Sequence, residues 1–472
     1  MDDFSDVMIG LEVHIRLLTK SKLFCSCPNE EPDTPNANVC PICMGFPGTK
    51  PSLNKKALEL ATIAALALNC NINHEIAFSR KVYFYPDLPK NFQITQYELP
   101  IGINGTLELT KTKKKIGISR VHIEEDPAKL VHIGGDITNA SYTLVDYNRS
   151  GMPLIEVETK PEISSPEEAR DALNSLALIL GHLGVCNPNA EGSIRVDANV
   201  SIKGGKRVEI KNITGFLNVE RALLFEIARQ RQMKLQGMEV QQETRHFDEL
   251  KKTTVSLRAK ETEEDYGYIF EPDLTTYRIT DSFINGLLPR LEELPSKRIE
   301  RLVKNFGIDE HSAQIVVYEG KEFADFFESC AKSFPNKKLL ARWSTGDLLK
   351  CLNYNKTDIA HSKVTIDGYI AFLNLIDKNT ITERFAKELI KEYVSTGKDP
   401  NELIKGKIKE ISDEDLQKII DDTIAENQKA IEEYKKGNAK SIQYLIGKVL
   451  EATNNTVDPK RIRNMLIARV AQ

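Results

Sequence analysis

The spacing of apolar residues changes near residue 292, and this change separates two kinds of fold within one chain. Before it, short segments alternate apolar and polar residues, which indicates β-strands with one buried face. After it, apolar residues recur every three or four positions, as in amphipathic helices. A chain of 472 residues is long enough for about two to four domains. We therefore predict a strand-rich domain with some helices at residues 1–292, an all-helical domain at 293–405 and a last helical domain at 406–472.

Alternation, capping residues and turn residues predict the individual elements. In residues 7–17, Leu11, Val13 and Ile15 share one face, and Glu12 and His14 share the other. Further strands are expected at 116–123, 142–147, 195–203 and 208–211, the last two joined by a turn at Gly204 and Gly205. Helices are expected at 54–70, 166–183 (with Ser165 as N-cap), 218–236, 295–305, 309–318, 321–332, 336–352, 366–376, 382–395 and 400–409. Residues 405–411 read as a charged linker to three or four more helices.

The composition is that of an ordinary globular protein, with 41% hydrophobic and 28% charged residues, and it excludes a collagen-like or wholly disordered chain. The uncharged stretch at 60–70 has 11 residues, whereas a helix needs about 20 to cross a bilayer. The first residues contain neither a basic leader before an apolar run nor an Arg-rich amphipathic segment. We therefore expect a cytoplasmic protein.

The net charge of −4 argues neither for nor against a nucleic-acid partner, but the charges are unevenly distributed. Residues 434–472 contain two acidic residues and eight basic ones: Lys435, Lys436, Lys440, Lys448, Lys460, Arg461, Arg463 and Arg469. This excess fits a solvated helix face, and it fits equally well a surface that binds a phosphate backbone.

Four of the eight cysteines are clustered in two close pairs, Cys25 with Cys27 and Cys40 with Cys43. Two thiol pairs separated by a short loop suit tetrahedral Zn²⁺, and the residues between the pairs include too few apolar side chains to hold a loop together. We therefore expect a structural zinc site in an insertion at residues 25–43. The alternative is four free thiols in a reducing compartment.

Acids, imidazoles and cations lie on the polar faces of the expected strands. These residues are Glu12, His14, His122, Glu124, Glu125, Asp126, Glu156, Glu158, Asp197, Asn199, Glu209 and Lys211. Oxygen ligands with an imidazole suit Mg²⁺ or Mn²⁺, and neighbouring cations suit a polyphosphate. The sequence contains no Walker motif, no dinucleotide-binding G-x-G-x-x-G after a strand and no G-x-S-x-G motif. The pattern therefore allows two interpretations. One is metal-assisted phosphate chemistry, and the other is a solvent-exposed sheet face that carries charged side chains.

Residues 80–93 combine aromatic and cationic side chains around two prolines. Such a segment suits an edge that stacks on bases or grips phosphates, and it equally suits an aromatic packing cluster.

Eight segments, in this order, resemble the family of B subunits of tRNA-dependent amidotransferases, GatB of the GatCAB complex. They are Ile9-Gly-Leu-Glu-Val-His14, Lys81-Val-Tyr-Phe-Tyr-Pro-Asp87, His122-Ile-Glu-Glu-Asp126, Asp146-Tyr-Asn-Arg-Ser-Gly-Met-Pro-Leu-Ile-Glu156, Gly192-Ser-Ile-Arg-Val-Asp-Ala-Asn-Val-Ser201, Glu209-Ile-Lys-Asn212, Glu243-Thr-Arg-His-Phe-Asp248 and Gly447-Lys-Val-Leu450. The resemblance implies an α+β fold, in which a cradle of mainly antiparallel sheet with flanking helices precedes an all-helical domain and a small YqeY-like tail domain.

The resemblance also implies a function. Such a protein activates the side-chain carboxylate of Glu-tRNA(Gln), Asp-tRNA(Asn) or both with ATP and Mg²⁺. It then amidates the carboxylate with ammonia from the amidase A subunit of a heterotrimer that also contains a small C subunit. This is a ligase activity in protein biosynthesis, and the tail domain would contact the tRNA body. The other function that we consider is a zinc-bearing RNA-binding module that only presents tRNA to a catalytic partner.

Roles are carried over onto the matching residues. By this resemblance, the expected magnesium ligands are Glu12, His14, Glu125 and Glu156. Glu124 is the alternative candidate to Glu125. Lys81, Tyr83, Arg195, Asp197 and Lys211 resemble groups that handle phosphate or carboxylate, and Lys90 and Glu125 would lie where ammonia enters. One departure is Gly267, at a position where the family usually has arginine. Some relatives lack the four cysteines, so zinc is not essential to the reaction.

Overall fold

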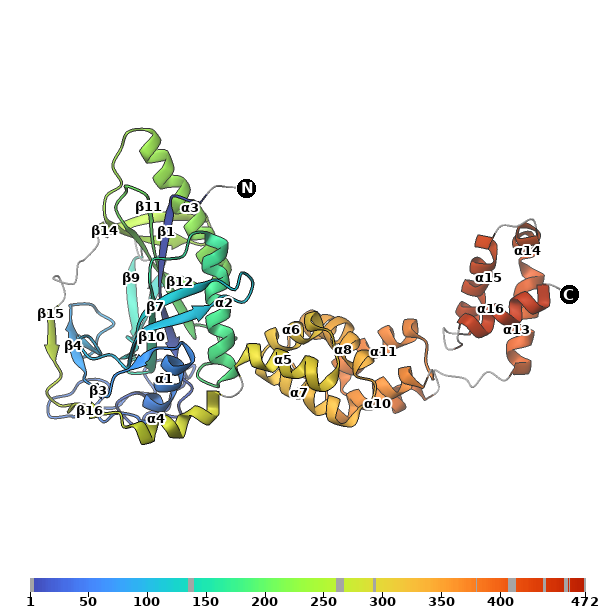
Figure 1. The fold of residues 1–472 in the computed structure, drawn as a ribbon, viewed down its shortest axis with the longest axis horizontal. Helices are drawn as coiled ribbons and strands as arrows, with labels where there is room; N and C mark the ends of the chain where they lie inside the picture. Colours follow the sequence, from blue (N-terminus) through green and yellow to red (C-terminus); the bar gives the residue numbers. More distant parts are fainter. Residues whose placement is uncertain are drawn as a thin grey trace. The chain divides into compact units, whose positions relative to one another are not determined.

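The computed structural model describes residues 4–134, 140–259, 267–291, 294–378, 380–405, 413–435, 439–453, 457 and 459–470 (Figure 1). The chain divides into two compact units, Met1–Pro295 and Ser296–Gln472. Residues 292, 293 and 406, where the expected domain boundaries fall, lie outside the described residues, so those boundaries stay predictions. Among the described helices, none is both long enough and apolar enough to span a membrane. The cytoplasmic location also stays a prediction.

A nine-stranded sheet forms the centre of the first unit. Its strand order is β14 (Thr253–Ala259), β13 (Glu243–Asp248), β12 (Val208–Thr214), β11 (Ile194–Ile202), β1 (Val7–Arg16), β10 (Pro153–Thr159), β7 (Lys115–Glu125), β6 (Gly102–Glu108) and β2 (Asn71–Ile72). The pair β12 and β13 is parallel, and the other neighbours in this sheet are antiparallel. The first strand of the chain is therefore the central one, between two strands that come more than a hundred residues later.

Smaller sheets and helices surround this sheet. The sheets are β15 (Gly267–Phe270) with β4 (Ser79–Val82) and β5 (Phe92–Thr95), β16 (Tyr277–Arg278) with β3 (Glu75–Ile76), and β8 (Lys129–Ile133) with β9 (Tyr142–Asp146). The helices are α1 (Lys55–Ala67), α2 (Pro166–His182), α3 (Phe216–Leu235), α4 (Asp281–Leu287) and the 3₁₀ turn η2 (Leu288–Leu291). The expected α+β fold with a mainly antiparallel sheet is confirmed.

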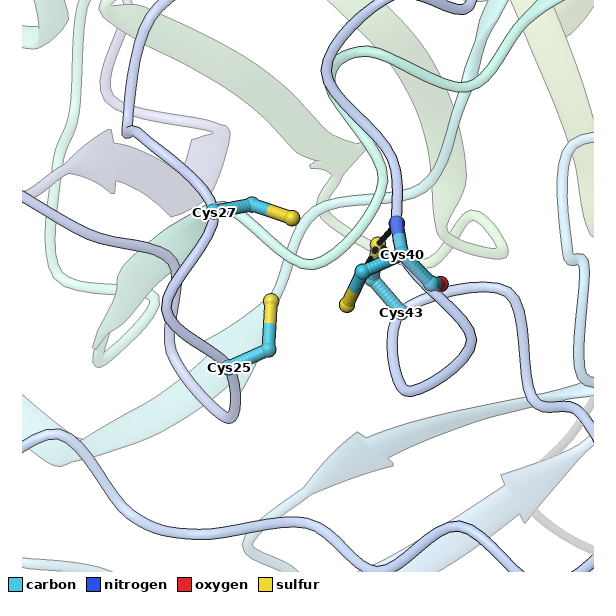
Figure 2. A group of neighbouring side chains, drawn as sticks. All are labelled: Cys25, Cys27, Cys40 and Cys43. Atoms are coloured by element: carbon cyan, nitrogen blue, oxygen red, sulfur yellow. Dashed lines mark hydrogen bonds between the residues drawn. The ribbon is translucent and has the colours of Figure 1, made fainter.

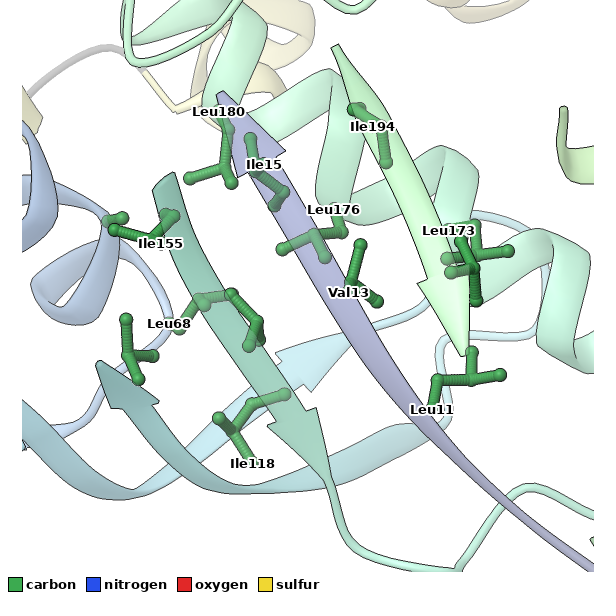
Figure 3. Packing of buried hydrophobic residues seen from close by; sticks show 14 of the residues in the cluster. Leu11, Val13, Ile15, Leu68, Ile118, Ile155, Leu173, Leu176, Leu180 and Ile194 are labelled. Carbon is green, nitrogen blue, oxygen red and sulfur yellow. The ribbon is translucent and has the colours of Figure 1, made fainter. Parts of the chain in front are cut away.

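One face of the sheet packs on helices and forms the core. Leu11, Val13 and Ile15 of β1 are buried against Leu173 and Leu176 of α2 (Figure 3). Each such side chain contributes roughly 1.5–3 kcal/mol on burial, so the alternation of β1 determines which face turns inward. As predicted, the Ser165 hydroxyl caps α2 by accepting the Glu168 N–H at 3.1 Å, with Pro166 as the first helical residue.

The second unit is helical throughout its described part. Its helices are α5 (Pro295–Phe306), α6 (Glu310–Tyr318), α7 (Lys321–Ser333), α8 (Lys337–Trp343), the π turn η3 (Ser344–Leu348), α9 (Leu349–Tyr354), α10 (Ile366–Asp377), α11 (Glu383–Thr396), α12 (Pro400–Ile404), α13 (Asp413–Glu426), α14 (Gln428–Lys435), α15 (Ala439–Ala452) and α16 (Pro459–Val470). Two separate apolar clusters lie within it, one around Trp343 and Tyr369 and one around Leu445 and Leu466.

Two details of the second unit differ from the expected elements. The single helix expected at 336–352 is interrupted by the π turn, where the Thr345 hydroxyl donates to the Ala341 carbonyl at 2.8 Å and competes with the helical ladder. The helix expected at 400–409 ends at Ile404, because the backbone of Lys405 is no longer helical (ψ 121°). Most of the charged linker expected at 405–411 lies outside the described residues. The four helices α13 to α16 agree with the expected three or four.

Candidate functional site

The face of the large sheet opposite the core carries the acids and imidazoles. His14 of β1 is the register partner of Glu156 on β10, and Glu156 is in turn the partner of His122 on β7. One step along, Glu12 lies between Glu158 on β10 and Asp197 on β11. Because directly opposed side chains lie close together on one face, these strands bring residues from four distant segments into one site.

The first cluster on this face joins His14, Glu124 and Glu156. The Nε2 atom of His14 lies 3.3 Å from Oε2 of Glu156 and 3.5 Å from Oε1 of Glu124. His122 adds a second imidazole, with its Nε2 3.1 Å from the same Glu156 oxygen. One ligand atom from each of His14, Glu124 and Glu156 lies within 4.8 Å of the others. An imidazole with two carboxylates is a donor set that suits Mg²⁺ or Mn²⁺.

Mutual pairing shifts the proton affinities within this cluster. Burial lowers the pKa of His14, but Glu156 and Glu124 more than offset this effect, so its pKa rises to about 10. Burial also lowers the pKa of His122, but Glu156 and Glu124 again more than offset this effect, so its pKa rises to about 9. Burial opposes ionisation of Glu156, yet the two imidazoles hold the pKa of this carboxyl well below its usual value. Without a metal ion, the cluster is therefore an ion pair between a carboxylate and two imidazolium groups.

The second cluster joins Glu12, Asp197 and Glu209, whose oxygens also approach within 4.8 Å of one another. Asn199 donates to Oε1 of Glu12 at 2.8 Å, and the backbone N–H of Asn212 donates to Oδ1 of Asp197 at 2.7 Å. The pairing of β11 with β12 shifts register beside Asp197, and such bulges are common next to functional sites. Burial, followed by the charges of Glu156, Asp197 and Glu209, raises the pKa of Glu12 to about 7. An arrangement of three acids at this distance favours bound cations.

Basic side chains border both clusters. Lys211 Nζ lies 3.7 Å from Asp197 and 3.9 Å from Glu209. Arg195, the register partner of His14, pairs with Asp126 at 2.5 Å, and Arg149 Nε lies 3.0 Å from the other Asp126 oxygen. Cations beside a cluster of oxygen ligands suit a bound polyphosphate, whose charge both can share.

Glu125 lies apart from the expected magnesium ligands. Both oxygens of Glu125 accept from Lys90 Nζ, at 2.5 and 2.6 Å, and one also accepts the Ile94 N–H at 2.8 Å. The geometry thus brings Glu124 to His14 and Glu156, and Glu125 to Lys90. Alternation on β7 explains the division, because neighbouring residues of a strand point to opposite faces.

Lys81 and Tyr83 lie at and just beyond β4, which belongs to the three-stranded sheet and not to the large one. Beside them, Arg80 pairs with Glu271 at 2.8 Å and covers the ring of Phe92 at 4.4 Å from its centroid. Phe84 is 85% exposed, so residues 80–93 contain both a packed part and an exposed aromatic side chain. The proposed phosphate role of Lys81 and Tyr83 stays a prediction.

Gly267 pairs with Val82 across β15 and β4. A Cβ atom at this position would lie 3.5 Å from Val82, which is ordinary contact, so the site has room for a side chain. Residues 260–266, directly before Gly267, lie outside the described part of the chain.

The four clustered cysteines meet in the first unit, with the sulfur atoms of Cys25 and Cys27 turned toward Cys40 and Cys43 (Figure 2). All four are free thiols, and the Sγ atoms of Cys40 and Cys43 are 3.8 Å apart. Zn–S bonds of about 2.3 Å place the sulfur atoms of a tetrahedral site about 3.8 Å apart, so the arrangement fits zinc. The hydrogen bond between Cys25 and Cys43 lowers the pKa of Cys43 to about 5 and raises that of Cys25, so without a metal the two thiols share a proton that metal binding would release.

A buried lysine accompanies these thiols. Lys22 is 0% exposed; its ammonium group donates to the Asn38 carbonyl at 2.8 Å and lies 3.9 Å from Cys43 Sγ. A buried cation beside a four-thiolate site offsets part of the negative charge that the site carries when it is loaded.

The basic residues counted in the tail lie on the surface wherever the structure describes their side chains. Arg469 pairs with Asp421 through two contacts of 2.7 Å, Arg461 pairs with Asp413, and Lys448 lies 3.1 Å from Glu451. Arg463 is exposed. The side chains of Lys435, Lys436, Lys440 and Lys460 lie outside the described residues.

Comparison with known proteins assigns a class to this fold and site. The family described as "GatB/GatE catalytic domain" matches residues 7–285, and the family described as "GatB domain" matches residues 325–470. The chain belongs to the GatB family, as its motifs indicated. It is similar to the B subunits of two aspartyl/glutamyl-tRNA(Asn/Gln) amidotransferases: it is 46% identical over 468 residues to that of Sulfolobus acidocaldarius (98% of each chain) and 41% identical over 478 residues to that of Carboxydothermus hydrogenoformans (99% of each chain).

Several members of the site have no role in the sequence-based prediction. The pattern marks His122, Asp126 and Glu158 only as polar strand residues, and Arg149 only as part of a motif. The signal that finds His122 is its position two residues before Glu124, because that spacing places both on one face of a strand. Asp126 and Arg149 meet Arg195 only in the folded chain, and local pattern carries no signal for that contact.

Proposed function

We propose that this chain is the B subunit of a tRNA-dependent amidotransferase, a ligase that forms carbon–nitrogen bonds with glutamine as amido donor. It would use ATP and Mg²⁺ to phosphorylate the side-chain carboxylate of Glu-tRNA(Gln), Asp-tRNA(Asn) or both, and then replace the phosphate with ammonia. The observation that supports this most strongly is the pair of acidic clusters on one sheet face, bordered by Lys211 and Arg195. A surface that only binds RNA has little use for buried carboxylates, because they repel phosphate.

The residues of the sheet face have distinct roles in the proposed reaction. His14, Glu124 and Glu156 would hold Mg²⁺, and Glu12 with Asp197 would bind a second cation or orient the first. Bound Mg²⁺ supplies charge neutralisation for the transferring phosphoryl group. Arg195 and Lys211 would bind phosphate oxygens and hold the reacting groups in line. A carboxylate oxygen of the substrate then attacks the γ-phosphorus, and ADP leaves.

Amidation completes the sequence. Ammonia attacks the acyl carbon of the mixed anhydride, the carbon–oxygen bond to phosphate breaks, and phosphate leaves as hydrogen phosphate with one proton from the nitrogen. The Lys90–Glu125 pair, with side chains 10% and 5% exposed, would lie beside the entry of ammonia, which comes from an amidase A subunit. Together with a small C subunit, these chains would form a heterotrimer. Zn²⁺ at the four cysteines would be structural, since four thiolates fill its coordination positions.

Glu12→Gln tests this proposal in the assembled complex. The variant should lose Mg²⁺-dependent release of phosphate from ATP in the presence of misacylated tRNA, and should bind that tRNA with nearly unchanged affinity. Assays with Glu-tRNA(Gln) and Asp-tRNA(Asn) separately would identify the substrate. An equal loss of tRNA binding would instead favour the zinc-bearing RNA-binding module.

Truncation after residue 411 tests the tail. Removal of helices α13 to α16 should weaken tRNA binding and flatten its dependence on salt, because each lost phosphate contact lowers the slope by about 1. An unchanged slope would exclude the tail from tRNA binding.

A further inference from the structure

The turn after the second cysteine pair rests directly on Lys90. The N–H groups of Met44, Gly45 and Phe46 donate back to residues 40–42 at 2.9–3.0 Å and define a tight turn. Gly45 has a φ of +67°, and a Cβ atom there would lie 2.3 Å from Cγ of Lys90. Only glycine allows the backbone to approach the lysine stem this closely.

Glu125, the partner of Lys90, lies beside Gly151, which in turn lies beside Cys43. Gly151 lies between Cys43 and Glu125: a Cβ atom on it would be 3.4 Å from Cβ of Cys43 and 3.9 Å from Oε2 of Glu125. Gly151 also donates its N–H to the Asp126 carbonyl and accepts the Leu23 N–H, each at 2.9 Å. The cysteine segment therefore touches Lys90 through Gly45, and only Gly151 lies between this segment and Glu125.

A cavity of about 180 Å³ joins these groups, and Cys25, Cys43, Gly45, Lys90 and Glu125 are among its lining residues. The residues between the cysteine pairs, 28–39, are exposed or half-buried except Asn38, which is buried. Apolar burial therefore contributes little to the order of this segment. Hydrogen bonds join Asn36 and Asn38 to residues 145–148, and a bound metal would add a constraint at the cysteine turns themselves.

We propose that the cysteine segment is a positioning element for Lys90, and that zinc, by closing the turn at Cys40 and Cys43, presses Gly45 against the lysine stem and keeps its ammonium on Glu125. This inference rests on the proposed zinc site and gives that site a task beyond local stability. Loss of zinc, or of the close approach at Gly45, frees Lys90 while the large sheet stays folded.

Acylation of lysines in the full-length chain, followed by mass spectrometry, measures the state of Lys90 without any activity assay. Lys90 is nearly buried and paired, so it should react slowly in the zinc-loaded protein. Chelation of zinc should raise its labelling rate by about tenfold or more, as expected when a local contact opens. Lys114, which pairs with Glu168 at 2.7 Å elsewhere in the first unit, is the internal reference and should not change.

Two glycine variants separate the contact from the metal. Gly45→Ala should raise Lys90 labelling to a similar extent with zinc still bound, because the new Cβ must displace the lysine stem. Gly48→Ala is the matched control: its φ is +83°, but nothing lies within 4 Å of the added atom, so it carries the same backbone strain without the clash. Its Lys90 labelling should equal that of the natural chain.

The inference is overturned if Lys90 labelling is unchanged by both chelation and Gly45→Ala. It is also overturned if chelation raises the labelling of Lys90 and Lys114 together while Gly45→Ala changes neither, since zinc then only stabilises the fold.

In the assembled complex, Gly45→Ala should lower the amide formed per phosphate released by about tenfold, as expected for a misplaced group beside the reaction. Absence of zinc from the purified protein, or of phosphate release by the natural complex, would contradict the proposed function instead, while Gly45→Ala would still report on the contact.

Discussion

The polar face of the large sheet and the tail helices α13 to α16 both carry many charges, but they hold them differently. On the sheet, Glu156 and His122 are largely buried and pair across strands that are distant in sequence. In the tail, Arg469 and Asp421 pair in solvent, with side chains 42% and 40% exposed. Buried charges carry a desolvation cost and persist where chemistry needs them, whereas exposed pairs have little cost and little effect.

Acidic and basic residues are separated along the tail sequence. Residues 434–472 carry a basic excess, yet residues 413–472 contain ten acidic and ten basic residues. Helix α13 supplies most of the compensating acids, among them Asp413 and Asp421, which pair with Arg461 and Arg469 of α16. The tail is therefore a domain with separated charges, not a uniformly basic one, and any phosphate-binding surface on it has to exclude α13.

The largest expected effect on the sheet side is that of Glu156→Gln. This change leaves His14 and His122 without the carboxylate that holds their protons, and both are charged at pH 7 because their pKa values are about 10 and about 9. We expect the metal-free protein to lose about 3 kcal/mol of stability in denaturant unfolding. Phosphate release by the complex should fall by roughly 10²–10³-fold. If neither the stability nor phosphate release changed, the buried charges of the sheet face would matter as little as the exposed pairs of the tail.

Removal of zinc should affect a third kind of region, the mostly exposed cysteine segment, which the expected metal and hydrogen bonds to residues 145–148 hold in place. Cys40→Ser should reduce bound zinc, which we expect at close to one equivalent in the natural chain. Proteolytic cleavage within residues 28–37 should become at least about tenfold faster, because local opening is no longer opposed by the metal. Elemental analysis and timed proteolysis measure the two effects. A metal-free chain that resists cleavage would disprove the role of zinc.

Glu12→Gln should stabilise the metal-free protein, and the effect should depend on pH. The pKa of Glu12 is raised from 4.5 to about 7, so its charged form is disfavoured in the folded state. Below pH 4.5 the carboxyl is protonated in both states and the variant gains nothing. Between pH 4.5 and 7 the natural protein loses stability as the unfolded chain releases the proton first. Above pH 7 the variant should be more stable by roughly 1–3 kcal/mol, measured by denaturant unfolding at pH 4 and pH 8. An equal difference at both pH values would refute this.

The smallest effect is expected in the tail. Arg469→Gln removes one exposed ion pair and should cost less than about 1 kcal/mol, an effect that high salt abolishes. Thermal unfolding of the full chain at low and high salt measures it. A cost as large as that of Glu156→Gln would mean that burial does not distinguish the two regions.

Local pattern is enough to predict which residues share a strand face. Alternation places Glu12 with His14, and Asp197 with Asn199, because side-chain direction in a strand depends only on position parity. The same rule, applied along β7, separates Glu124 from Glu125, which compete for one role when only the motif is considered. Capping chemistry likewise places the start of α2 at Ser165 and Pro166.

What could not be predicted depends on contacts between distant segments. Strand order, which puts β1 between β10 and β11, follows from packing of the whole sheet and not from any one strand. The register shift beside Asp197 and the meeting of Asp126 with Arg149 and Arg195 depend on that order.

The central place of β1 has a consequence for synthesis of the protein. This strand leaves the ribosome well before its two neighbours, which begin only at Pro153 and Ile194. At translation rates of about 5–20 residues per second, the nascent strand waits roughly ten seconds or longer for its first partner. During that interval the apolar side of β1, with Leu11 and Val13, is available to other chains or to a chaperone. Pairing of β1 in the large sheet therefore depends on segments made much later, and crowding of unfinished chains should favour association through this strand.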